Sequence, residues 1–255
     1  MTLAERVEAI FDRVERAQEH LESIKGELLS YYNSDPCRLR GEFQPKAHRS
    51  GEAQGPGGEL ASLNVRLNTL IGEFLHDLRS ALNHLARELV TANGLTPTES
   101  SQFRVFGKEP CSQRKQALLN INPGIGPEAR TLITDAQPYK LGDRYSEHPL
   151  WVLHELWNID KHREVIARGG VPFLHFVGDL PAFSYTSRLE SATAYGAKLI
   201  LVPDDPDLEA NAYGTFQVTL HEPHAGIEDP PLLETFDAIL KTVLGLVNAA
   251  EDRCF

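Results

Sequence analysis

Cysteine is scarce in this sequence, and its three cysteines, Cys37, Cys111 and Cys254, form no Cys-x-x-Cys pair. This spacing argues against a disulfide framework and a thiolate zinc site, and it favours a reducing, cytoplasmic environment. Long apolar runs are missing as well, because no stretch approaches the roughly 20 residues that span a bilayer. We therefore expect no membrane partner. The charged, amphipathic segment Met1–Ile10 is also unlike a signal or transit peptide.

Basic residues are fewer than acidic ones: the sequence has 25 Lys and Arg residues and 36 Asp and Glu residues, for a net charge of −11. A non-specific nucleic-acid coat needs a basic surface, and this balance disfavours one. The deficit is uneven, however, because residues 36–165 carry sixteen basic and fifteen acidic groups. A local phosphate site in this neutral stretch is compatible with the charge.

Signatures of several enzyme classes are also absent. The chain has no GxSxG elbow, so a serine hydrolase of that type is not expected. The glycine-rich segment 123–127 lacks the Lys-Ser/Thr that would make it a P-loop. Residues 154–158 nearly spell the HExxH zinc motif, but Asn158 replaces the second histidine and asparagine is a poor zinc ligand. We expect no cofactor and no metal.

Two long amphipathic helices dominate what is present. Thr2-Leu3-Ala4-Glu5 forms a capping box. Behind it, apolar residues recur at alternating steps of four and three, which predicts a coiled-coil-like helix of about thirty residues. The seam consists of Leu3, Val7, Ile10, Val14, Ala17, Leu21, Ile24, Leu28 and Tyr31. A second helix is predicted over about 68–93, with one broad apolar face formed by Ile71, Phe74, Leu75, Leu78, Leu82, Leu85 and Leu89.

The rest of the chain predicts further helices and some β-structure. Residues 37–43 and 60–67 could form a β-hairpin within 37–67. Residues 164–222 read as an antiparallel β-meander with strands near 171–177, 183–189, 197–202 and 216–221. Helices are expected after Gly126-Pro127, from about Pro149 to Arg163, and from about 230 to 253. The predicted fold class is therefore α+β, mainly α. We expect one domain over 1–255, a long-helix bundle formed by 1–36, 68–163 and 230–253 with a small antiparallel β-sheet.

Polar side chains interrupt two of the apolar helices and mark the candidate site. On the 68–93 helix, His76, Arg79 and Asn83 lie on one flank, while Asp77, His84 and Glu88 lie on the other. Arginine and asparagine beside histidine can hold a phosphate through several donors, and histidine beside carboxylate can act as a base. The alternative is that these groups only join neighbouring helices by hydrogen bonds.

The 149–163 helix carries the second half of the candidate site. His154, Asn158 and His162 recur at i, i+4 and i+8, with Lys161 beside them and both tryptophans around them. We predict that this stripe, together with His76 and Asn83, binds substrate. Here too a structural role is the alternative, with Trp157 in the core and the charged residues in a salt-bridge network.

Arg79-Ser80-Ala81-Leu82-Asn83-His84 resembles the motif of the HEPN superfamily, in which four to six residues stand between an arginine and a histidine. The segments 75–85 and 149–163 are also similar to a set of bacterial proteins, many from actinobacteria. HEPN domains are α-helical, and many are metal-independent ribonucleases. The resemblance implies an endoribonuclease in which Arg79 and His84 are catalytic. His84 would be the general base toward a ribose 2′-hydroxyl, and Arg79 would stabilise the phosphorane.

The spacing adds a geometric condition to this hypothesis. Residues five apart on one helix point about 140° apart, so Arg79 and His84 cannot easily grip one small group. The HEPN solution is a homodimer, with RNA as its partner. Two alternatives remain open. One is a non-catalytic interaction protein whose polar residues cement the bundle, and the other is a metal-binding bundle formed by His76, His84, His154 and His162.

Overall fold

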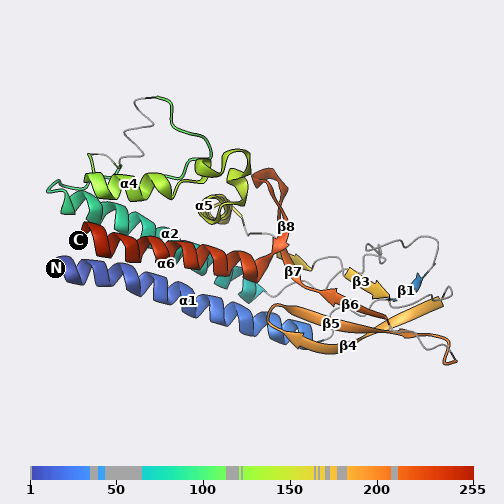
Figure 1. Ribbon diagram of the computed structural model, residues 1–255. Coiled ribbons are helices and arrows are strands. Elements are labelled where there is room, and N and C mark those ends of the chain that lie inside the picture. The colour runs from blue at the N-terminus through green and yellow to red at the C-terminus, as the bar shows by residue number, and fades with distance from the viewer. Residues whose placement is uncertain are drawn as a thin grey trace.

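The computed structural model describes residues 2–34, 40–43, 65–112, 121, 123–163, 165, 167–169, 173–176, 183–207 and 212–255. The fold is α+β and mainly α, as predicted. Long helices lie side by side, and antiparallel sheets lie at the end of the bundle opposite both chain termini (Figure 1).

Helix α1 (Leu3–Asn33) begins with the predicted capping box. The Thr2 hydroxyl accepts a hydrogen bond from the Glu5 amide at 3.3 Å, and the Glu5 carboxylate accepts one from the Thr2 amide at 2.6 Å. The predicted seam is buried from Val7 to Leu28, but it ends on Tyr32 in place of Tyr31. Tyr32 is four positions after Leu28, which itself is four positions after Ile24. The end of the seam therefore departs from the alternating steps of a heptad, as expected of a straight helix with 3.6 residues per turn.

Helices α2 (Val65–Ala92) and α6 (Leu232–Cys254) pack against α1 to complete the long bundle. The predicted apolar face of α2 is buried throughout. At the α2–α6 contact the rings of Phe74 and Phe236 stack with their centroids 4.6 Å apart. In the described part of the chain, no helix combines the length and the apolar character needed to cross a bilayer.

Among the described residues, three shorter helical elements cover the bundle: α4 (Pro127–Asp135), the 3-10 segment η1 (Pro138–Glu147) and α5 (Pro149–Asp160). Both α-helices begin with the proline expected at a first helical position. Helix α5 packs on α2 and α6 and crosses them, so that it is seen nearly end-on in Figure 1. The polar stripe of α5 is thereby carried toward α2.

The larger sheet has the order β1-β4-β5-β6-β3 and is antiparallel throughout. Its strands are β1 (Arg40–Phe43), β3 (Phe173–Phe176), β4 (Phe183–Thr193), β5 (Gly196–Pro203) and β6 (Ala212–Phe216). Strand β1 pairs with β4. The predicted hairpin partner at 60–67 is wrong for residues 65–67, which begin α2, while 60–64 lie outside the described residues. Strand pairing is set by distant segments, so local pattern could not identify this partner.

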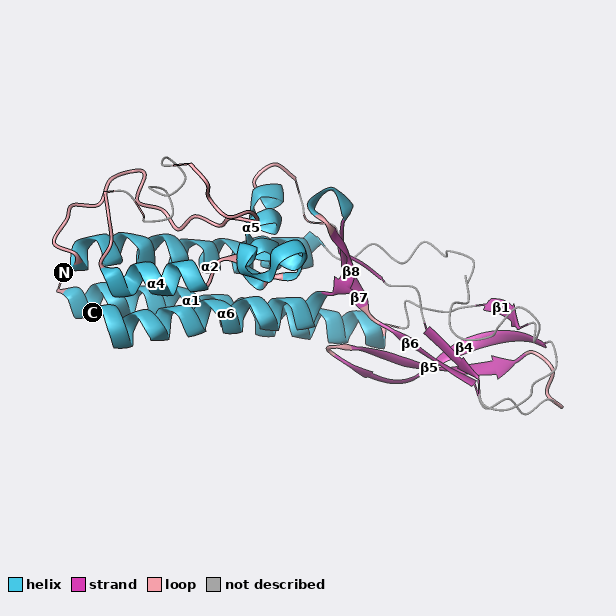
Figure 2. Cartoon of the chain, turned by 45° about the horizontal axis from the view of Figure 1, so that its top comes forward, coloured by secondary structure: helices cyan, strands magenta, loops and turns pink. Residues whose placement is uncertain are grey.

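A second sheet, of order β2-β7-β8, joins the larger sheet to the bundle, as Figure 2 shows. Its strands are β2 (Ala167–Gly169), β7 (Val218–Glu222) and β8 (Ile227–Pro231), with the short η2 (Pro223–Ala225) between the last two. The strand predicted at 216–221 is confirmed over 218–221, as β7, but its start is wrong, because Phe216 ends β6 in the other sheet. Phe216, Val218 and Leu220 are all buried, so their alternation runs through the break unchanged and hides it. The last helix begins at 232, since 230 and 231 end β8.

Candidate functional site

Arg79 is the most unusual residue of α2. Its side chain is buried, with only 3% of the residue exposed. Nη2 donates to the Phe103 carbonyl at 2.6 Å, whereas the buried Nε and Nη1 have no hydrogen-bond partner among the described residues. Burial, and then repulsion by Arg104, lowers the pKa of Arg79 to about 10. The guanidinium is still cationic at neutral pH, and no carboxylate in the described part of the chain pairs with it.

Helix α5 brings a second cation and an aromatic ring to Arg79. The guanidinium carbon lies 5.0 Å from the centroid of the Trp157 ring, and Lys161 Nζ lies 2.9 Å from the same centroid. Burial and Arg79 both lower the pKa of Lys161. A ring face attracts cations, which explains how two of them can lie close together. It does not supply the hydrogen-bond acceptors that the nitrogens lack.

His154 faces the same group of cations. Burial, followed by Arg79, Lys161 and Arg104, lowers the pKa of His154 to about 4, so its imidazole is neutral at pH 7. Its Nε2 lies 3.2 Å from the side-chain nitrogen of Asn158. An amide nitrogen only donates, so Nε2 accepts and the hydrogen-bond network assigns the ring proton to Nδ1. That Nδ1 is buried and has no partner among the described residues.

We call this set of residues the Arg79 cluster: Arg79, Arg104, Trp151, His154, Trp157, Asn158 and Lys161. Five of its buried nitrogens lack a hydrogen-bond partner in the described structure, namely Arg79 Nε and Nη1, Arg104 Nε, Trp151 Nε1 and His154 Nδ1. With the proton of His154 on Nδ1, every one of them is a donor. Buried donors without acceptors are rare and costly, and they point to a missing acceptor. Chemically, the Arg79 cluster can hold an anion.

The backbone that carries Arg104 is held in place by side chains from other elements. Asn83 Oδ1 accepts from the Phe103 amide at 3.2 Å. The buried Gln137 side chain accepts from the Phe106 amide at 3.0 Å and donates to the Arg104 carbonyl at 3.0 Å. Segment 103–106 is thus fixed before any ligand arrives, which lowers the ordering cost of binding.

His84 lies on a different side of α2, toward α1. It is half-buried, and burial together with Arg13 and Arg87 lowers its pKa, against an opposite effect of Glu88. The groups that act on His84 and those that act on Arg79 have no member in common. Within one chain, Arg79 and His84 therefore form no common site, as their helical spacing predicts.

Other polar residues of this flank cement the bundle, as the structural alternative predicted. Arg6 Nε bonds Glu88 at 2.7 Å, and Arg16 Nη2 bonds the buried carboxylate of Asp77 at 2.6 Å. His20 Nε2 also lies 3.4 Å from Asp77 Oδ2. These contacts join α1 to α2 and leave Arg79 outside their network.

The structure brings together four of the eight predicted site residues: Arg79, His154, Asn158 and Lys161. Asn83 acts on the backbone of segment 103–106, and His76 and His162 are exposed. His162 leaves the predicted stripe because α5 ends at Asp160. Sequence reasoning missed Arg104, which lies in a segment without helical or strand periodicity, and took Trp151 only as bulk.

No metal site emerges from these groups. In the described ranges, no three His, Cys, Asp or Glu side chains lie close enough together to hold a metal ion. His84 and His154 in particular face different elements, α1 and segment 103–106. The metal-binding alternative is therefore without a site in this part of the chain.

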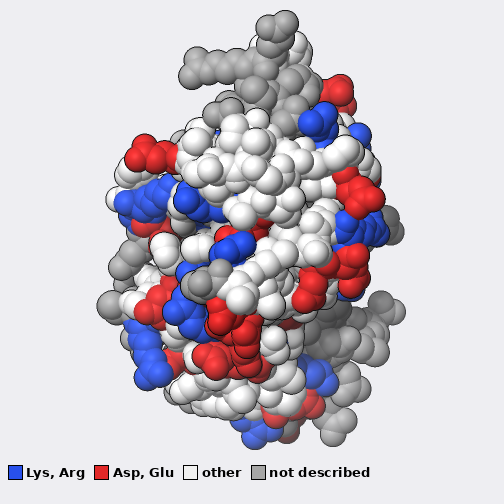
Figure 3. Space-filling view, turned by 90° about the vertical axis from the view of Figure 1, so that its left-hand side faces the viewer, with Lys and Arg blue, Asp and Glu red and all other residues white. Residues whose placement is uncertain are grey.

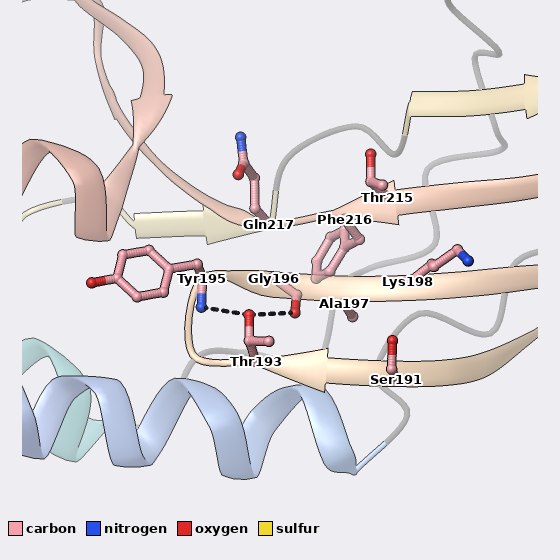
Figure 4. A pocket seen from close by; sticks show the side chains of 9 residues that line it. All are labelled: Ser191, Thr193, Tyr195, Gly196, Ala197, Lys198, Thr215, Phe216 and Gln217. Atoms are coloured by element: carbon pink, nitrogen blue, oxygen red, sulfur yellow. Dashed lines mark hydrogen bonds between the residues drawn. The ribbon is translucent and has the colours of Figure 1, made fainter.

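Two hollows on the surface of the described residues lie elsewhere. One of about 370 Å³ lies at the β4–β5 turn, where Figure 4 shows its nine lining residues. There the Thr193 hydroxyl accepts from the Tyr195 amide at 3.2 Å and donates to the Gly196 carbonyl at 3.4 Å. Another of about 560 Å³ lies between η1, β8 and α6. Neither includes a residue of the Arg79 cluster, so the unpaired donors, and not the shape of the surface, identify the candidate site.

Comparison with protein-family models, with curated proteins and with solved structures finds no match for this chain. The resemblance to HEPN proteins therefore rests on the Arg79–His84 spacing and on its place in a long bundle helix. The chemistry of the site has to be argued from its own geometry.

Gly107 is required by the aromatic wall beside the Arg79 cluster. A Cβ on Gly107 would lie 2.6 Å from the Tyr145 ring and 3.0 Å from the Trp151 ring. Replacing Gly107 with alanine should cost about 1–3 kcal/mol in unfolding free energy, because these packed rings must move. It should also alter the tryptophan emission. Urea unfolding followed by far-UV circular dichroism measures the first effect.

Gly245→Ala is the matched control for Gly107→Ala. Gly245 lies within α6, and nothing stands within 4 Å of its added Cβ. Alanine there should stabilise the protein by about 0.5–1 kcal/mol through helix propensity. Equal effects of the two substitutions would contradict the packing role assigned to Gly107.

Proposed function

We propose that this protein binds a phosphate-bearing ligand at the Arg79 cluster, and that RNA supplies that phosphate. The observation that carries the proposal is the buried Arg79 guanidinium, which has two unpaired nitrogens and no carboxylate partner among the described residues. Uncompensated buried charge is strongly unfavourable. A ligand that brings negative charge and acceptors would offset this cost.

Phosphate suits the donors better than a neutral ligand does. Arginine donates charge-assisted hydrogen bonds to phosphate oxygens, and lysine adds a point charge. RNA as the ligand is supported by the HEPN-like spacing of Arg79 and His84, and the near-neutral charge of residues 36–165 is compatible with it. On the face at the chain termini, acidic and basic side chains interleave (Figure 3). This mixture supports one local site in preference to a broad basic surface.

RNA cleavage is the second candidate function, and one observation favours it. His84 is partly exposed and its pKa is lowered, so that its imidazole is neutral at pH 7 and able to accept a proton. Because Arg79 faces another side of α2, a second subunit would have to complete the catalytic pair. In this proposal the protein is a cytoplasmic, HEPN-like homodimer that needs no metal.

The test compares binding and cleavage of a fluorescent RNA in the presence of a chelator. Arg104→Gln should weaken RNA binding about tenfold or more, since it removes a charged donor from the Arg79 cluster. His84→Ala should leave binding unchanged and abolish any cleavage. Arg130→Gln, an equal loss of charge at an exposed residue of α4, is the control and should change neither.

The outcomes separate the two functions. RNA binding that is insensitive to Arg104→Gln would overturn the binding site. Cleavage that survives His84→Ala, or that comes from a strictly monomeric protein, would overturn the catalytic role of His84 in a dimer and leave the binding function intact.

A further inference from the structure

The side chains of the Arg79 cluster differ in burial, from Arg79, which we call its floor, to Lys161, which we call its rim. Arg79 at the floor is 3% exposed, Arg104, Trp151 and His154 are half-buried, and Lys161 is exposed. The unpaired nitrogens of the four inner residues are themselves buried. Because Arg79 is buried and Lys161 is exposed, a ligand that contacts both has to enter the Arg79 cluster from its exposed side. A group at the end of a chain can do this, whereas a phosphate within a polymer carries an ester substituent on each side.

The Arg79 cluster carries three positive charges, which is more than a ligand with a single negative charge can balance. Arg79, Arg104 and Lys161 are cations close enough for Arg79 to lower the pKa of Lys161 and for Arg104 to lower the pKa of Arg79. No ion pair to any of the three occurs in the described part of the chain. A phosphodiester brings one negative charge, whereas a terminal phosphate brings nearly two at pH 7. The dianion balances these three cations more closely.

The number of unpaired donors agrees with the charge. Five buried nitrogens without partners come from four side chains on α2, on segment 103–106 and on α5. A terminal phosphate offers three non-ester oxygens as acceptors, while an internal phosphodiester offers two. More of the unpaired donors are thus satisfied by a terminal phosphate.

We propose that the Arg79 cluster recognises a terminal phosphate, a phosphomonoester at the end of an RNA chain, in preference to an internal phosphodiester. This inference rests on the proposed phosphate-binding function and adds the part of the RNA that is read. Arg79 and Arg104 bind the phosphate oxygens, while Trp151 and His154 Nδ1 donate from the wall. Lys161 at the rim neutralises the remaining charge.

The chain carries its own probe for this proposal. Its only two tryptophans, Trp151 and Trp157, both belong to the Arg79 cluster, so intrinsic tryptophan emission reports events there. The titrants are inorganic phosphate and three short RNAs of one sequence, with a 5′-phosphate, with a 3′-phosphate, or with hydroxyls at both ends. At least one phosphorylated RNA should bind ten times more tightly than the hydroxyl-ended RNA. Inorganic phosphate should compete with it, and the two phosphorylated arms show which end is read.

Lys161→Met tests the rim without disturbing the core, because Lys161 is exposed. This substitution should weaken the binding of phosphorylated RNA at least threefold more than the binding of hydroxyl-ended RNA. Lys140→Met is the matched control, since Lys140 is also exposed and lies 5.6 Å from the ring centroid of Tyr139, outside the Arg79 cluster. Lys140→Met should change neither affinity.

The failures of the two proposals are distinguishable. Equal affinity for phosphorylated and hydroxyl-ended RNA, both weakened by Arg104→Gln, would overturn the terminal-phosphate inference and keep RNA binding. Binding of inorganic phosphate without any RNA would leave a terminal-phosphate site and remove RNA as its source. If no titrant binds or changes the tryptophan emission, both the proposed RNA binding and the terminal-phosphate inference are overturned.

Discussion

Replacing Arg79 with methionine should abolish phosphate and RNA binding while the unliganded protein stays nearly as stable as the wild type. The loss of a buried charged partner of the ligand should weaken binding about a hundredfold or more. Stability has two opposing contributions. The hydrogen bond from Nη2 to the Phe103 carbonyl is lost, at a cost of about 1–3 kcal/mol. Removal of a buried, unpaired cation returns a comparable amount. Methionine is flexible enough to fill most of the vacated space.

The measurement for Arg79→Met pairs urea unfolding with titration of the tryptophan emission. Arg79→Lys is the matched variant, since it keeps the charge but loses the planar set of donors. It should bind phosphate more weakly than the wild type and more tightly than Arg79→Met. A loss of more than about 3 kcal/mol in Arg79→Met, with phosphate binding retained, would show that Arg79 only clamps segment 103–106. The interaction-protein alternative would then be favoured.

The helices of this fold could be predicted from the sequence because their signals are local. The capping box at Thr2 and the seam of α1 need no knowledge of partners. The same holds for the apolar face of α2. Strand order could not be predicted, because β3 pairs with β6 and β1 pairs with β4 across long stretches of chain. Nothing in a period-two pattern states which strand lies next to which.

The candidate site shows the same division. His154 and Asn158 are four residues apart on one face of α5, and Lys161 directly follows that helix, so the three could be grouped from sequence. Arg79 could be placed on a flank of α2. Their meeting depends on how α5 crosses α2, which no spacing reveals. Arg104 could not be predicted at all, because its place is set by Gln137 from another element.

Phe74→Ala should be the most damaging single substitution to the fold, with a loss of about 3–5 kcal/mol in unfolding free energy. Phe74 is fully buried on α2, and its ring stacks on Phe236 of α6 with centroids 4.6 Å apart. Alanine leaves a cavity at the contact of two long helices and removes the aromatic pair. Denaturant unfolding at 25 °C measures the loss.

Phe11→Ala is the matched control for Phe74→Ala, because Phe11 lies on α1 and is only partly buried. Its loss should be about 1 kcal/mol, in proportion to the smaller apolar area that it hides from water. A loss below about 1 kcal/mol for Phe74→Ala would contradict the central role of the α2–α6 contact.

Phe74 also precedes Arg79 by five residues on the same helix. The folded fraction of Phe74→Ala should still bind phosphate, whereas Arg79→Met should be folded and unable to bind. This opposite pair of results would separate the residue that stabilises α2 from the residue that α2 presents to a ligand.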